Sequence, residues 1–148
     1  MKKKFLLLTG LLIVTLLYGC GYGPIYSSKN FLFKINEIQH ANNKIDNQIA
    51  KSLKSISNDN TTNTLNLELS SKKEKITVSK NKNGDPEIFK LKILINIKVK
   101  NVKKTFFGEQ TYGNIENKFE LNEYEIQIEK QIISKMIDEI ILFLLELR

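Results

Sequence analysis

A strictly alternating run between Phe89 and Val99 constrains the fold of this chain more than any other stretch. Every second position of the run is apolar, namely Phe89, Leu91, Ile93, Ile95, Ile97 and Val99. The positions between them are mostly polar, namely Lys90, Lys92, Asn96 and Lys98, with Leu94 as the apolar exception. Because successive side chains of a strand point to opposite faces of a sheet, this pattern predicts a strand with one buried face and one face lined by lysines.

Two strands are predicted before this run. The first covers residues 31–39, and Ile38 breaks its alternation, which indicates a bulge or the strand end near Glu37. The second begins with alternating leucines, Leu65, Leu67 and Leu69. Ile76 and Val78 continue its apolar pattern with the opposite parity, so we expect a bulge or a break within residues 71–75.

A turn and a fourth strand complete the predicted sheet. Asn83-Gly84, within a polar cluster over residues 81–86, is the predicted reversal between the second and third strands. A looser strand is expected over residues 105–117, and it contains Gly108 and Gly113. Glycine inside a strand indicates either a bulge or a close approach by another backbone.

Two helices are predicted, each with an asparagine at its N-cap. Asn43, with Asp46 three residues later, begins a helix whose apolar face holds Ile45, Ile49, Leu53 and Ile56. Asn122, with Glu125 three residues later, begins a long final helix whose core stripe is Ile126, Ile133, Ile137, Ile140 and Leu144.

The last turns of the final helix are apolar on nearly every side. A stripe about 100° wide is enough for a helix that covers one sheet. The surplus side chains, Ile141, Phe143 and Leu145, therefore need a second surface, which we expect to be a partner protein or lipid. The alternative is that adjacent strands curl around the helix.

These elements predict an α+β fold. We expect a two-layer sandwich with a four-stranded, mostly antiparallel sheet and two helices packed on one face, in the order β-α-β-β-β-α. The lysine face of the third strand would then be the uncovered face of the sheet. Residues 31–148 are long enough for a single domain with a modest core.

The sequence contains few groups that could support catalysis. His40 is the single histidine of the chain and lies at a predicted strand–helix junction, so a Ser/His/Asp set cannot be assembled without it. Neither the ligand spacing of a metal site nor a glycine-rich phosphate loop is found. We therefore expect a protein that is not an enzyme and that binds no metal.

The first 20 residues have the pattern of an export signal. Lys2, Lys3 and Lys4 precede an apolar run from Phe5 to Tyr18, which is shorter than the roughly 20 residues that span a bilayer. The run is followed by Gly19 and by Cys20, the one cysteine of the chain, which cannot form an internal disulfide. An ordinary N-terminal membrane helix with an incidental cysteine is the alternative.

Leu17, Gly19 and Cys20 resemble the lipobox of bacterial lipoproteins, although Tyr18 stands where that pattern usually has Ala or Ser. The resemblance implies that residues 1–19 are a signal peptide, that Cys20 carries covalent lipid such as palmitate, and that residues 20–30 form an anchor and tether. Two or more acyl chains hold a protein firmly at a membrane. By the same analogy, Gly21 in place of Asp indicates the outer membrane. Apart from this lipid we expect no cofactor.

The tether and the net charge add two further indications. Glycines and Pro24 oppose regular structure in the tether, yet Tyr22, Ile25 and Tyr26 suggest that it packs on something. The net charge is +7, and it falls to +4 without the three lysines of the signal. A basic exported protein suits anionic lipid or glycolipid phosphate, and nucleic acid is a poor partner for it. A codon bias toward Lys, Asn and Ile would also explain the charge.

Residues 20–26, Cys-Gly-Tyr-Gly-Pro-Ile-Tyr, are similar to the Cys-Gly-Phe-x-Pro-Leu-Tyr that opens the mature lipopolysaccharide-assembly lipoproteins of the LptE (RlpB-like) family, especially the alphaproteobacterial type. The predicted order of two helices and four strands resembles that family. The turn at Asn83-Gly84-Asp85 and the position of Tyr112 in the last strand agree with it. The final helix departs from the family in being more apolar and poorer in Ala and Arg.

This resemblance implies a subunit of the lipopolysaccharide transport machine, anchored in the outer membrane of a Gram-negative cell and facing the periplasm. Such a subunit plugs an LptD-like β-barrel, assists its assembly and binds lipopolysaccharide. Lys80 and Lys82 at the tip between the second and third strands, with Lys90 and Lys92 further along, are candidate lipopolysaccharide-binding residues, against the alternative of a solvated lysine face. Ile141, Phe143 and Leu145 would then contact the barrel.

Two other functions are consistent with the sequence. One is a free lipoprotein that acts as a binding or adaptor module for another envelope partner. The other is a lipid-binding protein that uses its lysine face at a membrane surface.

Overall fold

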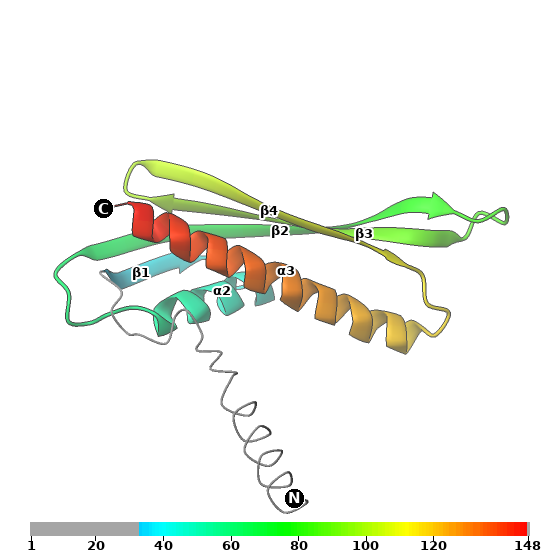
Figure 1. Cartoon of the computed structure of the whole chain (residues 1–148), viewed down its shortest axis with the longest axis horizontal. Coiled ribbons are helices and arrows are strands. Elements are labelled where there is room, and N and C mark those ends of the chain that lie inside the picture. Colours follow the sequence, from blue (N-terminus) through cyan, green and yellow to red (C-terminus); the bar gives the residue numbers. More distant parts are fainter. Residues whose placement is uncertain (1–32, 148) are drawn as a thin grey trace, which may run out of the picture.

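The structure, a computed structural model, describes residues 33–147, so Cys20 and the predicted signal and tether lie outside the described residues. The same is true of Phe31 and Leu32 at the start of the first predicted strand. The described elements are β1 (Lys34–His40), α2 (Lys44–Ser55), β2 (Thr64–Lys80), β3 (Pro86–Val99), β4 (Val102–Gly113) and α3 (Lys118–Glu146), as Figure 1 shows.

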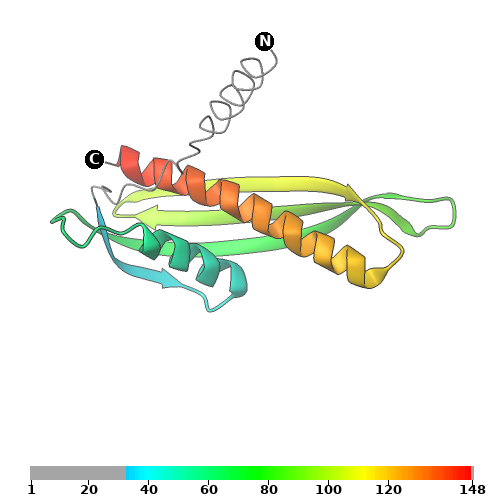
Figure 2. The same cartoon turned by 60° about the horizontal axis from the view of Figure 1, so that its bottom comes forward.

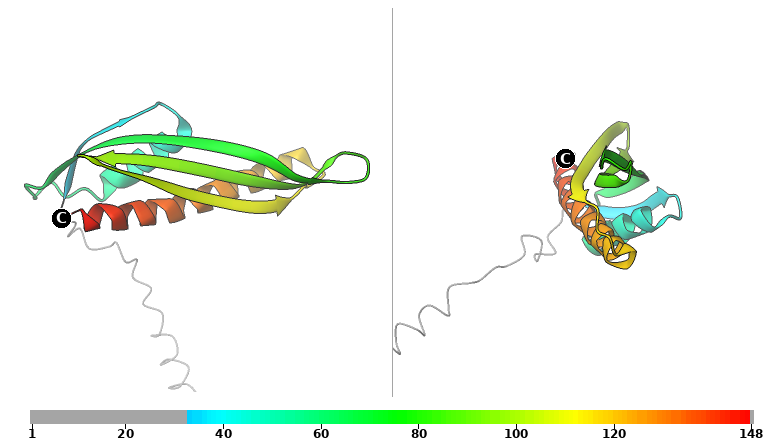
Figure 3. Two further views of the ribbon diagram at one scale, coloured as in Figure 1. Left: turned by 90° about the horizontal axis from the view of Figure 1, so that it is seen from above. Right: turned by 90° about the vertical axis from the view of Figure 1, so that its right-hand side faces the viewer.

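The strands form one mixed sheet in the order β1-β2-β3-β4. β1 is parallel to β2, because the chain passes through α2 between them, whereas β2–β3 and β3–β4 are antiparallel. Both helices cover the same face of the sheet (Figures 1 and 3). The predicted α+β two-layer sandwich with a mostly antiparallel sheet is therefore confirmed.

The alternation of β3 builds the centre of the core. Its odd-numbered side chains face the helices, and Ile93, Ile95 and Val99 have no exposed surface. Burial of one such side chain contributes about 1.5–3 kcal/mol. The even-numbered side chains from Lys90 to Lys98 lie on the other face, which no described element covers (Figure 3).

β2 differs from the sequence prediction. Its pairing with β3 is regular through residues 71–75, so the bulge or break expected there is wrong, and the register shifts lie between Thr77 and Lys80. Ile76 and Val78 are on the uncovered face, 39% and 52% exposed. The parity does not slip, because lysines replace leucines on the helix-facing side of this half of the strand. The bulge expected near Glu37 in β1 is confirmed by a register shift between Ile35 and Glu37.

The predicted N-cap of the first helix is confirmed, and that of the final helix is wrong. Asn43 is the N-cap of α2, and its Oδ1 accepts a hydrogen bond from the amide of Asp46 at 2.8 Å, as predicted. α3 begins earlier than predicted, because Asn117 and not Asn122 is its N-cap. Asn117 Oδ1 accepts from the amides of Phe119 and Glu120, and its Nδ2 donates to Glu120 Oε1. Residues 117–120 are all exposed, so apolar periodicity could not reveal this first turn.

The apolar C-terminal turns of α3 are largely covered by the sheet. Ile141 and Phe143 are 3% and 6% exposed, and Leu145 is half-buried. The rings of Phe143 and Phe106 of β4 meet edge to face with centroids 5.9 Å apart. For Ile141 and Phe143, the alternative that strands curl around the helix therefore holds in the described chain. None of the described helices has a stretch apolar enough to cross a bilayer.

The N-terminal half of α3 is attached by polar contacts instead. The carboxylate of Glu129, 4% exposed, accepts from Lys73 of β2 at 2.7 Å and pairs with Lys44 of α2 at 3.4 Å. Burial raises the pKa of Glu129, but the hydrogen bond and the charge of Lys73, with that of Lys44, outweigh burial and hold it below its usual value. One turn earlier, Glu125 pairs with Lys75 and accepts from the Tyr112 hydroxyl at 2.8 Å.

Glu129→Gln should lower the free energy of unfolding at neutral pH by about 1–3 kcal/mol, because two lysines lose their shared anion. A carboxyl with a lowered pKa stabilises the fold above its unfolded-state pKa, and this contribution disappears as the pH falls through the folded-state pKa. The difference in unfolding free energy between the wild-type protein and the variant should therefore shrink as the pH falls below 4.5, the usual pKa of a glutamate. Urea unfolding across this pH range measures it, and a difference that is independent of pH would contradict it.

Gly108→Ala should destabilise the protein by about 1–3 kcal/mol, because the added methyl overpacks the interface between β4 and α3. A Cβ at position 108 would lie 2.5 Å from Ile132 Cγ2 and 3.0 Å from Met136 Sδ. The sequence predicted a bulge or a close approach by another backbone at this glycine, and both are wrong here, because the strand pairing is regular and the atoms that come close are helix side chains. Gly113→Ala is the control, since a Cβ there has no atom within 4 Å. Equal urea midpoints for the two variants would rule out the close contact.

Candidate functional site

The uncovered face of the sheet carries two of the candidate lysines, Lys90 and Lys92. The register places its side chains in rows across β2, β3 and β4, such as Glu68–Lys98–Lys103, Ser70–Asn96–Thr105, Lys72–Leu94–Phe107 and Glu74–Lys92–Glu109. Five lysines and three glutamates alternate over this face, so it is polar and moderately basic.

Many of these lysines are neutralised by neighbours on the same face. Lys98 pairs with Glu68, and Lys90 pairs with Glu109 at 3.2 Å. Glu74 accepts from Lys72 at 2.6 Å, and this hydrogen bond, with the charges of Lys72 and Lys92, lowers the pKa of Glu74. Exposed pairs of this kind each contribute only about 0–1 kcal/mol. Their lysines remain able to exchange partners.

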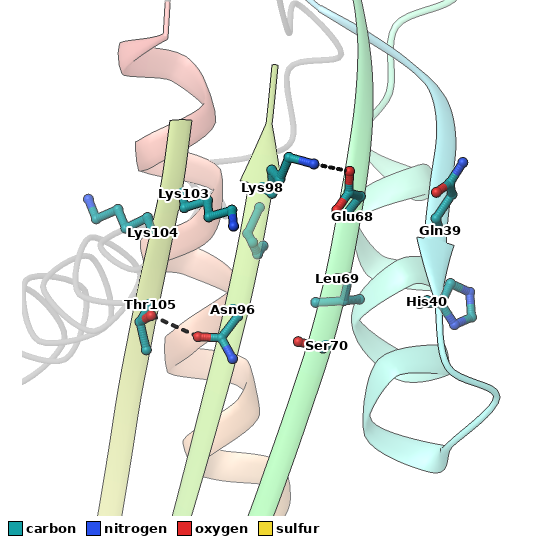
Figure 4. A pocket seen from close by; sticks show the side chains of 11 residues that line it. Gln39, His40, Glu68, Leu69, Ser70, Asn96, Lys98, Lys103, Lys104 and Thr105 are labelled. Carbon is teal, nitrogen blue, oxygen red and sulfur yellow. Dashed lines mark hydrogen bonds and ion pairs between the residues drawn. The ribbon is translucent and has the colours of Figure 1, made fainter. Parts of the chain in front are cut away.

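A hollow of about 550 Å³ lies on the same face, near the turn between β3 and β4 (Figure 4). All four strands contribute to it: Gln39 and His40 from β1, Glu68 and Ser70 from β2, Asn96 and Lys98 from β3, and Lys103 and Thr105 from β4. The Thr105 hydroxyl donates to Asn96 Oδ1 at 2.7 Å, which fixes the centre of the floor. The hollow is open and is lined by donors of several kinds.

Sequence reasoning missed this hollow. His40 was placed at a strand–helix junction, and it does end β1, where its Nδ1 lies 2.9 Å from the carbonyl oxygen of Ala41. The residues that meet in the hollow are set by the two-residue turn at Lys100 and Asn101, where Lys100 has a positive φ of 53°. That turn places Lys103 opposite Lys98 and Thr105 opposite Asn96. A tight turn before residue 102 was the signal that could have revealed this register.

The four candidate lysines fall in two environments. Lys80 ends β2 and Lys82 lies in the turn that follows, where both are exposed and form no ion pair with the described residues. Lys90 and Lys92 lie on the uncovered face, half-buried, with Lys92 Nζ 5.4 Å from the ring centroid of Phe107. The structure therefore separates a free basic tip from a partly neutralised lysine row.

Local hydrogen bonds close the turn at the tip. Asn81 Oδ1 accepts from the amides of Asn83 and Asp85, both at 2.9 Å, and Gly84 takes a positive φ of 89°. The predicted reversal at Asn83-Gly84 is therefore confirmed. The β2–β3 hairpin extends beyond both helices (Figure 3), so its lysines are accessible from several sides.

The chemistry available on this surface is the binding of anions. Ammonium groups and side-chain amides donate to phosphate or carboxylate oxygens. Within residues 33–147, no three His, Cys, Asp or Glu side chains come together as a metal site would require. Cys20, the predicted lipid attachment site, lies outside the described residues. Of the apolar candidates on α3, Ile141 and Phe143 are buried within the described domain and Leu145 is half-buried, and contact of this set with a barrel stays a prediction.

The sequence matches no protein-family model, and no curated protein matches it. Its fold, however, is similar to that of rare lipoprotein B from Shewanella oneidensis, with a TM-score of 0.55 and 14% identity over 74% of this chain and 93% of that one. Lipoprotein B from Nitrosomonas europaea is similar too, with a TM-score of 0.56 and 14% identity over 74% of this chain and 80% of that one. At these identities the likeness concerns the fold.

Proposed function

We propose that this chain is an outer-membrane lipoprotein of the lipopolysaccharide transport machine, which plugs an LptD-like barrel, assists its assembly and binds lipopolysaccharide during insertion into the outer leaflet. The proposal is supported by the combination of a sequence pattern with a fold. A chain with a single cysteine directly after an export-signal pattern has the fold of rare lipoprotein B. The Cys-Gly-Tyr-Gly-Pro-Ile-Tyr segment after that signal resembles the opening of the LptE family and supports the same conclusion.

The shape of the domain is consistent with this role. Helices protect one face of the sheet, and the long β2–β3 hairpin projects past them with Lys80 and Lys82 at its tip (Figure 3). Lipid A and inner-core sugars carry dense phosphate and carboxylate groups. Ammonium groups on a projecting tip, which pair with no carboxylate of residues 33–147, can reach such groups and compete with the divalent cations that crosslink them.

The runner-up is a free lipoprotein that acts as an adaptor for another envelope partner. The hollow near the β3–β4 turn favours this function, because it presents donors from four strands away from the tip. The two functions differ in their partner. Only the transport function requires stable association with a large outer-membrane barrel.

The full chain, expressed with its own signal, should be recovered from outer membranes with acyl chains on Cys20 and an N-terminus at that residue. A large β-barrel should co-purify with it after crosslinking in cells. Intact-mass spectrometry and identification of the crosslinked partner measure both. Cys20→Ser should abolish the lipid mass and remove the protein from the outer-membrane fraction. A chain that begins at Met1 with a free thiol would overturn the proposal, and a lipidated chain that captures another partner would support the adaptor.

Lys80→Glu combined with Lys82→Glu should weaken binding to lipopolysaccharide aggregates roughly three- to tenfold at low salt, since each exposed charge pair contributes up to about 1 kcal/mol. Lys51→Glu combined with Lys54→Glu is the matched control, because both lysines are exposed on α2 and the charge change is the same. Pull-down and titration measure the affinities. Equal affinities for the two double variants would reject a role of the tip.

A further inference from the structure

A shallow groove of about 340 Å³ lies where the edge strand β4 meets the C-terminal turns of α3. Its apolar lining comes from both elements, with Phe106 and Phe107 on β4 and Leu142 and Phe143 on α3. We refer to it as the β4–α3 groove. In Figures 1 and 2 the first half of β4 and the last turns of α3 run side by side at one end of the molecule.

The groove leaves apolar surface exposed at an unpaired edge. The packed rings of Phe106 and Phe143 are buried and form its floor. Leu142, by contrast, is 53% exposed beside them, and Phe107, 49% exposed, directs its ring to the uncovered face across the edge of β4, where it pairs with Leu94. β4 is the last strand of the sheet, so no described strand pairs with its outer side. Exposed apolar surface gathered in one groove is a mark of a contact site.

Charges at the rim restrict what the groove can take. Lys104 Nζ lies 5.4 Å from the ring centroid of Phe106 and 4.7 Å from that of Phe143, so this cation is held over the floor. Glu139 and Glu146 flank Leu142 on the helix and form no ion pair with the described residues. An occupant with aromatic side chains that carry hydroxyls, and with few charges, suits such a site.

The described chain begins at the same end of the molecule as the groove. Lys34, the first residue of β1, pairs with Thr64, and its amide donates to Asn63 O at 2.8 Å. Val102, the first residue of β4, pairs with Val99 of β3, and Val99 in turn pairs with Leu67 near the start of β2. The start of β4 therefore lies at the same end of the sheet as the start of β1. Figure 3 shows the start of β1 and the C-terminal turns of α3 at one end.

The residues that precede Phe33 are long enough to reach the groove. The strands β1 and β4 are the two edges of a four-stranded sheet, which places them about 14 Å apart. Residues 21–32 can span up to about 40 Å when extended. The segment can therefore pass the end of the sheet and still reach the groove with several residues to spare.

We propose that the tether docks in the β4–α3 groove, with Tyr22, Ile25 and Tyr26 seated against its apolar lining. These three side chains match the site, since tyrosine combines an apolar ring with a hydroxyl that can meet Glu139 or Glu146. Lys29 is the one charged residue between positions 21 and 32 and complements the acidic rim. Gly21, Gly23 and Pro24 disfavour a regular added strand, so the contact is made by side chains.

A photocrosslinking experiment on the full chain tests this docking. A benzophenone amino acid replaces Leu142, and the protein is irradiated in detergent after purification. The expected product is an internal crosslink to the tryptic peptide that ends at Lys29, whichever residue the mature chain begins with. The same probe at Val78, which is 52% exposed on the β2–β3 hairpin, is the control and should give no such crosslink.

Ile25→Ser combined with Tyr26→Ser should lower the yield of this crosslink roughly tenfold, the size expected when two apolar side chains no longer enter an apolar groove. Thermal unfolding of the double variant verifies that the domain itself is unchanged. Crosslinks from position 142 to a second copy or to another protein would overturn the proposal, as would an undiminished yield in the double variant. The lipid state of Cys20, read from the same digest, tests the proposed function separately.

Discussion

The diagonal contact of α3 with the sheet is the constraint on which the rest of the structure depends (Figure 2). It has two chemically different halves. Toward its C-terminus the helix buries Ile140, Ile141 and Leu144 against the strands, and Gly108 lets Ile132 and Met136 approach the backbone of β4. Toward its N-terminus Glu129 and Glu125 bridge to Lys73 and Lys75. Apolar area supplies most of the stabilisation, whereas the buried carboxylate of Glu129 links the helix to two lysines on different elements, Lys44 on α2 and Lys73 on β2.

The same division explains how far the sequence predicted the fold. Where alternation or helical periodicity met the core, as in β3 and α2, the predicted faces and the Asn43 cap are those observed. Prediction failed where polar residues replace apolar ones at helix-facing positions. Lys73 and Lys75 made β2 look as though its parity slipped, because their partners on α3 lie 56 and 50 residues away in the sequence. Asn117 was missed as a cap because its first turn carries no buried side chain. The hollow on the uncovered face depends on a turn register that composition does not specify.

Two surfaces remain on the described chain after the helices have covered one face of the sheet. The uncovered face is polar, and its lysines and glutamates largely satisfy each other, so an anionic ligand there would displace existing ion pairs at little cost. The β4–α3 groove has an apolar floor, in which the rings of Phe106 and Phe143 pack on each other, and Leu142 beside the floor is exposed. A ligand that is anionic at one end and hydrocarbon at the other could use both surfaces in principle. The two are separated by the edge of β4, however, and a tether seated in the groove would leave the polar face as the accessible one.

The length of the sheet relates the two ends of the domain to the membrane in the proposed function. In that proposal the anchor at Cys20 precedes Phe33, which lies beside the start of β2, and the basic tip lies at the other end of β2. A strand of 17 residues spans roughly 55 Å at the usual rise of a strand. This exceeds the roughly 30 Å of a bilayer core. A domain held at the inner surface of the outer membrane by Cys20 could therefore carry Lys80 and Lys82 through a barrel to the level of the outer leaflet. Docking of the tether would strengthen this arrangement, because it shortens the slack between lipid and sheet and so fixes how far the tip can reach.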